Sequence, residues 1–318
     1  MDRAISINQN FLIAIYLVAP ILGVILLIDY YFFGAYIKNL LPNSPNWWGL
    51  FILVFFFPHA IASAFSFADK EYFTAYKKPL VYGLPVIIVA VLLIPFFIGW
   101  EVIFLMNLLF SSYHLYGQLT GVTKLLMRNI GFFYFAWRYS VLAFFMLAYV
   151  VLFVPDFFGV DFRTYLNPLI YFFAPVVLAF NILALKNSKT KKGAIYLWAN
   201  FFLFVLALSY YIAGYYFFTF LALVLVHDIT AFAFYIAHDH NRNIGEIKNY
   251  FYKLFHFTKI PIFILCPLLS FLMAYLLREY SAIYLVSSVV YFFWFFHYYS
   301  ELFMWKYGTV HRQYISLS

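Results

Sequence analysis

Four histidines of this sequence lie inside long apolar stretches, where an ionisable side chain is rare. They are His59, His114, His227 and His297. An ionisable side chain at membrane depth costs free energy, so one that is found there usually marks a site. Neutral imidazole is the commonest protein ligand for metals and suits iron, zinc, copper and nickel. The four residues are therefore candidate metal ligands, although each one alone could also be a helix–helix hydrogen bond.

The stretch from 222 to 243 carries two His–Asp pairs on one expected helix. The first is His227 with Asp228, and the second is His238 with Asp239. Eleven residues separate the two histidines, which places them about 20° apart around the helix axis and roughly 16 Å along it. That distance is too long for both to bind one metal, so each pair needs partners from other helices. His238 and Asp239 are open to three interpretations: a cytoplasmic entrance, ligands of a second metal, or a proton relay.

Other polar side chains near the four histidines could complete a site. Two carboxylates could orient the imidazole rings or bind the metal themselves, namely Asp228 and Glu301. Two side chains that flank one of the histidines could donate hydrogen bonds to a bound oxygen species, namely Tyr113 and Gln118. The remaining histidines are expected in solvated loops: His240, His256 and His311.

The composition indicates which elements must hold these residues. The 318 residues are 66% hydrophobic and only 10% charged, whereas a soluble domain has about 25% charged residues. We therefore expect an all-α, multi-pass protein of the cell membrane that forms a single integral membrane domain over residues 1–318. The net charge of +8 does not indicate a nucleic-acid partner, because the cations lie in short loops between apolar stretches. The single cysteine, Cys266, excludes a disulfide framework and a cysteine-based metal site.

Ten stretches are long and apolar enough to be membrane spans of about 20 residues. They are 9–29, 47–68, 79–98, 100–119, 131–155, 165–185, 194–215, 218–240, 260–277 and 281–304. With these spans, sixteen of the twenty lysines and arginines fall on one side and three on the other, which places both termini in the cytoplasm. The longest polar loop, 240–259, combines aromatic residues with lysines and is expected to lie on the membrane surface as an amphipathic helix.

The ten-span arrangement brings three histidines to a common depth. His59, His114 and His297 lie on even-numbered spans, nine to eleven residues before the first cytoplasmic cation. At 1.5 Å per residue this is roughly 14 to 16 Å from the cytoplasmic edge. His227 is fifteen residues from Arg242, or roughly 22 Å. We therefore predict that the four histidines meet in the cytoplasmic half of the bundle.

The order of these motifs is also informative. The sequence has Pro58 and His59 with Asp69 downstream, then Tyr113-His114-x-x-Gly117, then His227 and finally His297. This order resembles the bacterial and archaeal Brp/Blh membrane proteins, the retinal-forming β-carotene 15,15′-dioxygenases. The resemblance implies a multi-helix membrane fold, histidine ligands for non-haem iron, and cleavage of a polyene double bond with O₂.

Two positions depart from the pattern of that family. The first motif here reads PHAIASAFSFAD, where the family usually has Pro-His-Gly with an aspartate a few residues later. The residue one turn after His227 is Ala231, where the family has a second histidine. The resemblance therefore implies a related fold and an iron site, and it leaves the substrate open between a polyene and another lipophilic molecule.

These features together predict a membrane-embedded oxygenase that uses non-haem Fe(II) and O₂ on an apolar molecule entering from the lipid bilayer. Copper and zinc stay open as the metal, and the oligomeric state is not predicted. Three other functions remain as alternatives. The first is a haem-binding electron-transfer protein, and the second is a proton-coupled transporter with a relay along the eighth span. The third is a scaffold that docks partners through 240–259.

Overall fold

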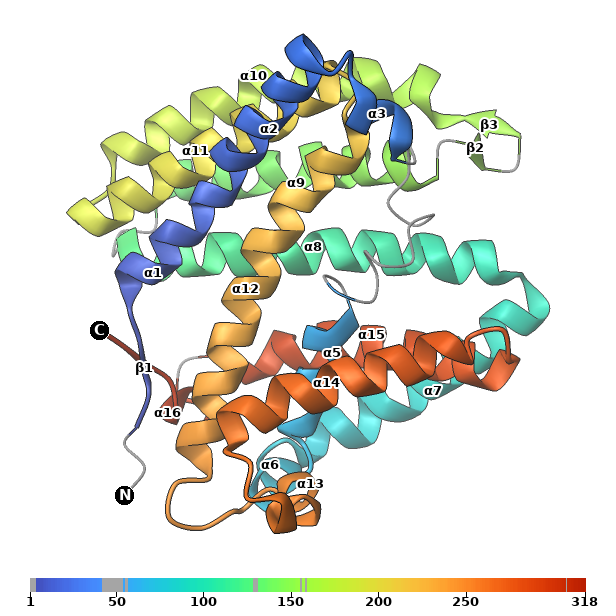
Figure 1. The fold of residues 1–318 in the computed structure, drawn as a ribbon, viewed down its shortest axis with the longest axis vertical. Helices are drawn as coiled ribbons and strands as arrows, with labels where there is room; N and C mark the ends of the chain where they lie inside the picture. The colour runs from blue at the N-terminus through green and yellow to red at the C-terminus, as the bar shows by residue number, and fades with distance from the viewer. Residues whose placement is uncertain are drawn as a thin grey trace. The chain divides into compact units, whose positions relative to one another are not determined.

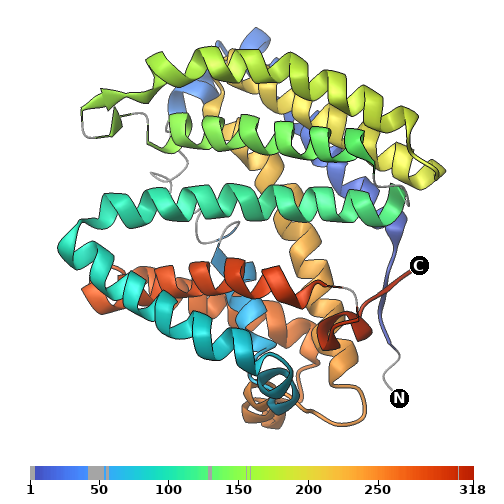
Figure 2. The same ribbon diagram turned by 180° about the vertical axis from the view of Figure 1, so that it is seen from behind.

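The computed structural model describes residues 4–41, 54, 57–127, 131–154, 156–157, 159–306 and 308–318, and these residues are almost wholly helical (Figures 1 and 2). Seven helices in this described part are long and apolar enough to cross a membrane. They are Gln9–Phe32, Lys77–Phe97, Phe132–Phe153, Phe162–Lys186, Lys191–Ile212, Tyr216–Arg242 and Ile262–Glu279. The prediction of a helical, membrane-type fold is therefore confirmed at this level.

The other three predicted spans coincide with the segments that carry His59, His114 and His297. Helix α8 (Trp100–Met127) and helix α15 (Tyr284–Met304) are long enough to span a membrane, but the hydropathy criterion does not select them. Their polar side chains lower the mean hydropathy. The predicted span 47–68 falls largely outside the described residues, which include helix α5 (Phe57–Phe65) from it. The count of ten spans stays a prediction.

The described residues form two compact units, and each is discontinuous in the sequence. Unit 1 is Met1–Leu12, Leu50–Asn107 and Asp228–Ser318, and unit 2 is Ile13–Gly49 and Leu108–His227. The polypeptide passes from one unit to the other inside helix α8 and inside helix α12 (Tyr216–Arg242). The two long helices that carry His114 and His227 are thus also the connections between the units.

Unit 1 is built around helix α5. This short helix packs on α14 (Ile262–Glu279) and on α15, and α15 packs in turn on α7 (Lys77–Phe97) (Figure 2). Its core contains Phe57, Phe65, Leu265 and Trp294 among its buried side chains. The shorter helices of the unit are α6 (Lys70–Ala75), α13 (Tyr250–Leu254) and α16 (Val310–Gln313).

Unit 2 is a layer of long helices. Helix α9 (Phe132–Phe153) packs along α10 (Phe162–Lys186), α10 packs on α11 (Lys191–Ile212), and α11 packs on α2 (Val18–Phe32) (Figure 1). The remaining elements are α1 (Gln9–Ala14), which unit 1 shares, the 3₁₀ turn η1 (Ile15–Leu17), α3 (Tyr36–Leu40) and the short hairpin of β2 (Asp156–Phe157) and β3 (Val160–Asp161).

Several helices begin at a side chain that caps their first backbone N–H groups. Asp69 accepts a hydrogen bond from Glu71 N at the start of α6, and Asp161 accepts one from Arg163 N at the start of α10. Thr190 does the same for Gly193 N at the start of α11. Such caps satisfy donors that have no partner within the helix.

The two ends of the described chain lie side by side in unit 1. Strand β1 (Ser6–Ile7) pairs in parallel with strand β4 (Ser316–Leu317) (Figure 1). The side-chain amide of Asn241 joins them further, because it bonds Ile5 N, Ile5 O and Tyr314 O at 2.7, 2.8 and 2.8 Å. Paired segments lie on one side of a membrane, so an even number of crossings separates them. Seven crossings would place the two strands on opposite sides of the membrane. If all seven helices cross it, at least one further segment must therefore cross it too.

We predict that residues 6 and 316 face the same side of the membrane, and that this side is the cytoplasm. Ser6→Cys and Ser316→Cys, each made in a Cys266→Ser background, should both react with a membrane-impermeant maleimide in inside-out vesicles and stay unlabelled in right-side-out vesicles. Labelling from opposite sides would contradict the strand pairing. Labelling of both only from the outside would contradict the cytoplasmic orientation.

Candidate metal centre

Unit 1 brings two of the predicted histidines together. His59 on α5 and His297 on α15 are both buried, with exposed fractions of 1% and 0%, and their ring centroids are 4.9 Å apart. One ring nitrogen of each lies within 4.8 Å of one on the other. The contact between Phe57 and Trp294, with ring centroids 5.3 Å apart, fixes α5 against α15 one turn or less from the two histidines.

The hydrogen bonds of Ser63 determine the tautomer of His297. The Ser63 hydroxyl has one proton, which it donates to the backbone carbonyl of Ala60 at 2.7 Å. Its oxygen lies 2.9 Å from Nδ1 of His297 and must therefore accept, so Nδ1 carries the imidazole proton. The lone pair of His297 is then on Nε2. A histidine held through one nitrogen in this way is oriented for coordination through the other.

Asp228 plays the corresponding part for His59. Its carboxylate oxygen lies 3.2 Å from Nδ1 of His59, and both side chains are almost fully buried. The ring of His59 is also bounded by Phe232 and Trp294, with ring centroids 6.5 and 6.3 Å away. A carboxylate this close to Nδ1 favours Nε2 as the coordinating nitrogen, as in the carboxylate–histidine arrangement of many metal sites.

Glu301 lies one turn after His297, as the sequence predicted. A Glu301 oxygen is 3.9 Å from Nδ1 of His297, and the same oxygen accepts a short hydrogen bond from the Tyr235 hydroxyl. The carboxylate is therefore placed to act on His297 through Nδ1, on the same nitrogen that Ser63 contacts.

Unit 2 brings the other two predicted histidines together. His114 on α8 and His227 on α12 are buried, with exposed fractions of 8% and 2%. Their ring centroids are 4.8 Å apart with an interplanar angle of 88°, and a ring nitrogen of each lies within 4.8 Å of one on the other. Each unit thus holds a buried histidine pair, and buried histidines grouped in this way could hold a metal ion.

The two pairs are connected by consecutive residues of one helix. His227 belongs to the pair of unit 2, and the next residue, Asp228, contacts His59 in the pair of unit 1. Helix α12 is the most buried of the seven helices that are long and apolar enough to cross a membrane, with 72% of its most apolar stretch inside the protein.

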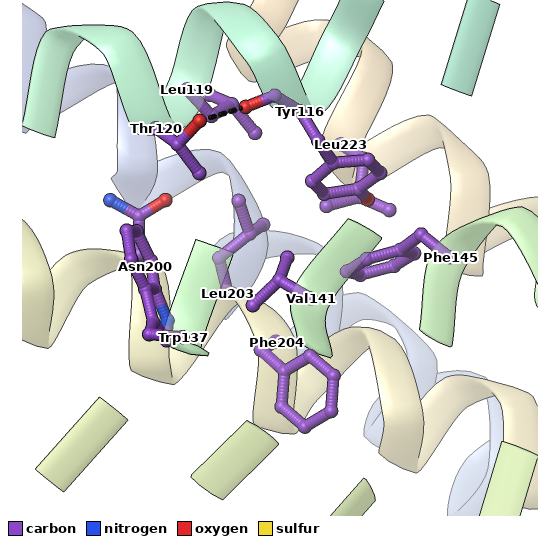
Figure 3. Close-up of a pocket in the computed structure, with 10 residues that line it drawn as sticks. All are labelled: Tyr116, Leu119, Thr120, Trp137, Val141, Phe145, Asn200, Leu203, Phe204 and Leu223. Carbon is purple, nitrogen blue, oxygen red and sulfur yellow. Dashed lines mark hydrogen bonds between the residues drawn. The ribbon is translucent and has the colours of Figure 1, made fainter. Parts of the chain in front are cut away.

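A small cavity in unit 2 lies along the same two helices. It is lined by Tyr116 and Thr120 of α8, by Leu223 of α12 one turn before His227, and by residues of α9 and α11 (Figure 3). The centre of a water-sized sphere can occupy about 20 Å³ of this cavity, which leaves room for about one small molecule. This cavity could hold a water or a dioxygen molecule, but not a long polyene.

The two side chains predicted to flank His114 are placed differently. Gln118 lies one turn after His114 and is partly buried, so it shares the face of that residue. Tyr113 is 40% exposed, because a residue next to a buried one on a helix points about 100° away from it. The role of Tyr113 as a hydrogen-bond donor stays a prediction.

His238 and Asp239 belong to a different polar group, also in unit 1. Nδ1 of His238 lies 2.7 Å from Asp239, and its Nε2 forms a short hydrogen bond with the Tyr72 hydroxyl. The prediction that His311 is a solvated loop residue was wrong. His311 is fully buried against Tyr72 and His238, because the segment that follows α15 turns back onto α6 and α12.

Sequence reasoning missed Ser63, Tyr235 and Tyr72. Ser63 could have been found, because it is four residues after His59 and therefore on the same helical face. Nothing in the local sequence around Tyr72 or Tyr235 indicates a polar partner, since their partners come from distant segments.

An ion pair beside this second group fixes α12 to α6. The guanidinium of Arg242, which is 4% exposed, bonds both carboxylate oxygens of Asp69, and it also bonds Glu71 and the Tyr314 hydroxyl. Asp69 is also the cap of α6. One carboxylate thus serves a buried cation and a helix terminus at once.

The comparisons with known proteins identify no relative. No family model, no curated protein and no solved structure matches this chain.

We predict that Asp69→Ala lowers the free energy of unfolding by about 3 kcal/mol or more, because it leaves a buried arginine with fewer partners and removes a helix cap. Unfolding of detergent-purified protein would measure this. Asp161→Ala is the matched control, because Asp161 is an exposed cap without a buried partner, and its loss should be clearly smaller. Equal losses in the two variants would contradict the role assigned to the Arg242 pair.

Proposed function

We propose that this protein is a membrane-embedded metalloenzyme with histidine ligands, a non-haem iron oxygenase that acts on a lipophilic polyene or lipid. The observation that carries the proposal is the group of four buried histidines that could hold a metal ion. His114 and His227 belong to unit 2, and His59 and His297 belong to unit 1, where Asp228 lies 3.2 Å from Nδ1 of His59.

In this proposal one ion is held by His59, His114, His227 and His297, the group of four buried histidines that could together bind a metal. The donor set fits a transition metal, because imidazole suits iron, copper and zinc. The hydrogen bond between Ser63 and Nδ1 of His297 fits it as well, and so does the close contact of Asp228 with Nδ1 of His59, since both leave Nε2 to coordinate. The motif order shared with the Brp/Blh proteins favours iron over copper and zinc.

Bound Fe(II) with open positions would supply the activation of O₂. The contribution of the protein is to orient the ligands and to keep water away from the reaction. The rings of Phe232 and Trp294 contact His59. The side chains of Asp228, Ser63 and Glu301 hold the imidazole rings in their orientation. The many exposed apolar side chains of the spanning helices suit a substrate that arrives through the lipid bilayer.

We predict that the detergent-purified protein contains close to one equivalent of iron and shows no haem Soret band. His59→Ala, His297→Ala, His114→Ala and His227→Ala should each lose the metal, because each removes one of the four ligands. Samples that contain the metal should also consume oxygen when a carotenoid is added, and samples that have lost the metal should not. His256→Ala is the control, because His256 is exposed, and it should keep both.

Metal retained in all four variants would refute the ligand assignment. Loss of metal only in the variants of one unit would restrict the ion to that unit's histidines. A Soret band that disappears in the variants would show a haem protein instead.

We predict that Ser63→Ala weakens metal binding about 10- to 100-fold, because it removes the acceptor that holds Nδ1 of His297. Competition with a chelator of known affinity would measure the change. Ser270→Ala is the matched control, since Ser270 is equally buried and donates to the carbonyl of Cys266 at 2.7 Å, away from the histidines. The prediction fails if both variants bind the metal as the wild type does.

A further inference from the structure

A second group of buried titratable side chains lies in unit 1, and the proposed oxygenase does not use it. Asp239 and His238 come from α12, Tyr72 comes from α6, and His311 comes from α16. All four are at most 1% exposed. Three segments that are far apart in the sequence thus converge on one line of polar atoms.

The hydrogen bonds along this line have a single direction. The Asp239 carboxylate accepts hydrogen bonds from the Ser66 hydroxyl at 3.2 Å and from the Tyr252 hydroxyl. Because it acts as an acceptor, Nδ1 of His238, which lies 2.7 Å from it, is the donor and carries the ring proton. Nε2 of His238 then carries the lone pair and accepts the Tyr72 proton.

The same reasoning continues to His311. The Tyr72 oxygen has given its only proton to His238, so it accepts from Nδ1–H of His311 at 3.0 Å. The lone pair of His311 is therefore on Nε2. This atom is buried and makes no hydrogen bond within the described part of the chain. The line of hydrogen bonds thus ends at a buried base.

The surroundings keep His311 and Tyr72 in these protonation states at neutral pH. Burial lowers the pKa of His311 well below its usual value, and the neighbouring His238 and Arg312 lower it further. Burial also raises the pKa of Tyr72 far above its usual value, so the phenol keeps its proton. The rings of His238 and His311 are stacked at 4.0 Å, and Trp305 covers His311 with ring centroids 4.8 Å apart.

We propose that Asp239, His238, Tyr72 and His311 form a proton relay, in which Nε2 of His311 takes up a proton and Asp239 receives one. As a proton binds Nε2, Nδ1–H of His311 passes its proton to the Tyr72 oxygen. Tyr72 passes its own proton to Nε2 of His238, and Nδ1–H of His238 passes its proton to Asp239. One proton enters, one carboxyl group forms, and both histidines stay neutral with exchanged tautomers.

The charged and titratable groups around the relay come from every element packed on it. Asp69, Glu71 and Tyr76 belong to the segment of α6, and Arg242 belongs to α12. Tyr252 and Cys266 lie beside Asp239, and Arg312 and Tyr314 follow His311. Arg242 is already paired with Asp69 and Glu71, so Asp239 is the only carboxylate bonded to the relay within the described residues. The relay can therefore carry one proton between Nε2 of His311 and the Asp239 carboxylate.

Nuclear magnetic resonance of protein labelled with ¹⁵N in the histidine rings tests the proposal, because protonated and unprotonated ring nitrogens have well-separated shifts. His238→Gln and His311→Gln would assign the signals. At neutral pH both residues should carry the proton on Nδ1. On acidification both should change to the Nε2–H tautomer at the same pH, with neither becoming an imidazolium.

Tyr72→Phe breaks the relay while keeping the ring, so His238 should lose its tautomer change and His311 should titrate alone. Tyr76→Phe is the control, since Tyr76 contacts the Tyr72 ring with centroids 5.6 Å apart but bonds only the backbone N of His311; the joint change should persist. The proposal is overturned if the wild-type histidines titrate at separate pH values or become imidazolium ions. It is also overturned if Tyr72→Phe preserves the joint change. Should Tyr72→Phe not fold, the wild-type spectra alone decide.

Discussion

The removal of imidazole nitrogens from water is the constraint on which much of unit 1 depends. A polar group that leaves water without a hydrogen bond costs about 1 to 3 kcal/mol, and an apolar interior offers few partners. Nδ1 of His297 has its partner in Ser63 on α5, and Nδ1 of His59 lies 3.2 Å from a carboxylate oxygen of Asp228 on α12. These contacts cross between helices, so they constrain the register of α5, α12 and α15 in addition to apolar packing.

The sequence predicted the membrane-type helical fold and the residues of the two histidine pairs, because both leave strong local signals. Apolar runs of spanning length are rare in soluble chains, and ionisable residues inside them stand out. Which histidines have rings in direct contact was not predictable, since counting residues along single helices gives depth and not neighbours. The burial of His311 was missed for a related reason. A short polar segment after a span is expected to be exposed to solvent, and only the contacts of this segment with α6 and α12 show that His311 is buried.

Two predicted spans whose helices are described, α8 and α15, are not selected by the hydropathy criterion, and they carry His114 and His297. A helix that contributes serine, asparagine, glutamine and histidine side chains to the interior has fewer apolar residues left to identify it as a span. Helices α8 and α15 both show this effect.

The discontinuity of unit 1 has a consequence for how the protein is made. Domains fold largely as units during synthesis, beginning from the N-terminal side. Unit 2 has all of its residues once position 227 has left the ribosome, whereas unit 1 lacks Asp228, His297 and strand β4 at that moment. His59 is therefore synthesised long before its partners and must wait in the membrane for them. A nascent chain that stalls after α12 would carry a finished helical layer and an incomplete binding centre.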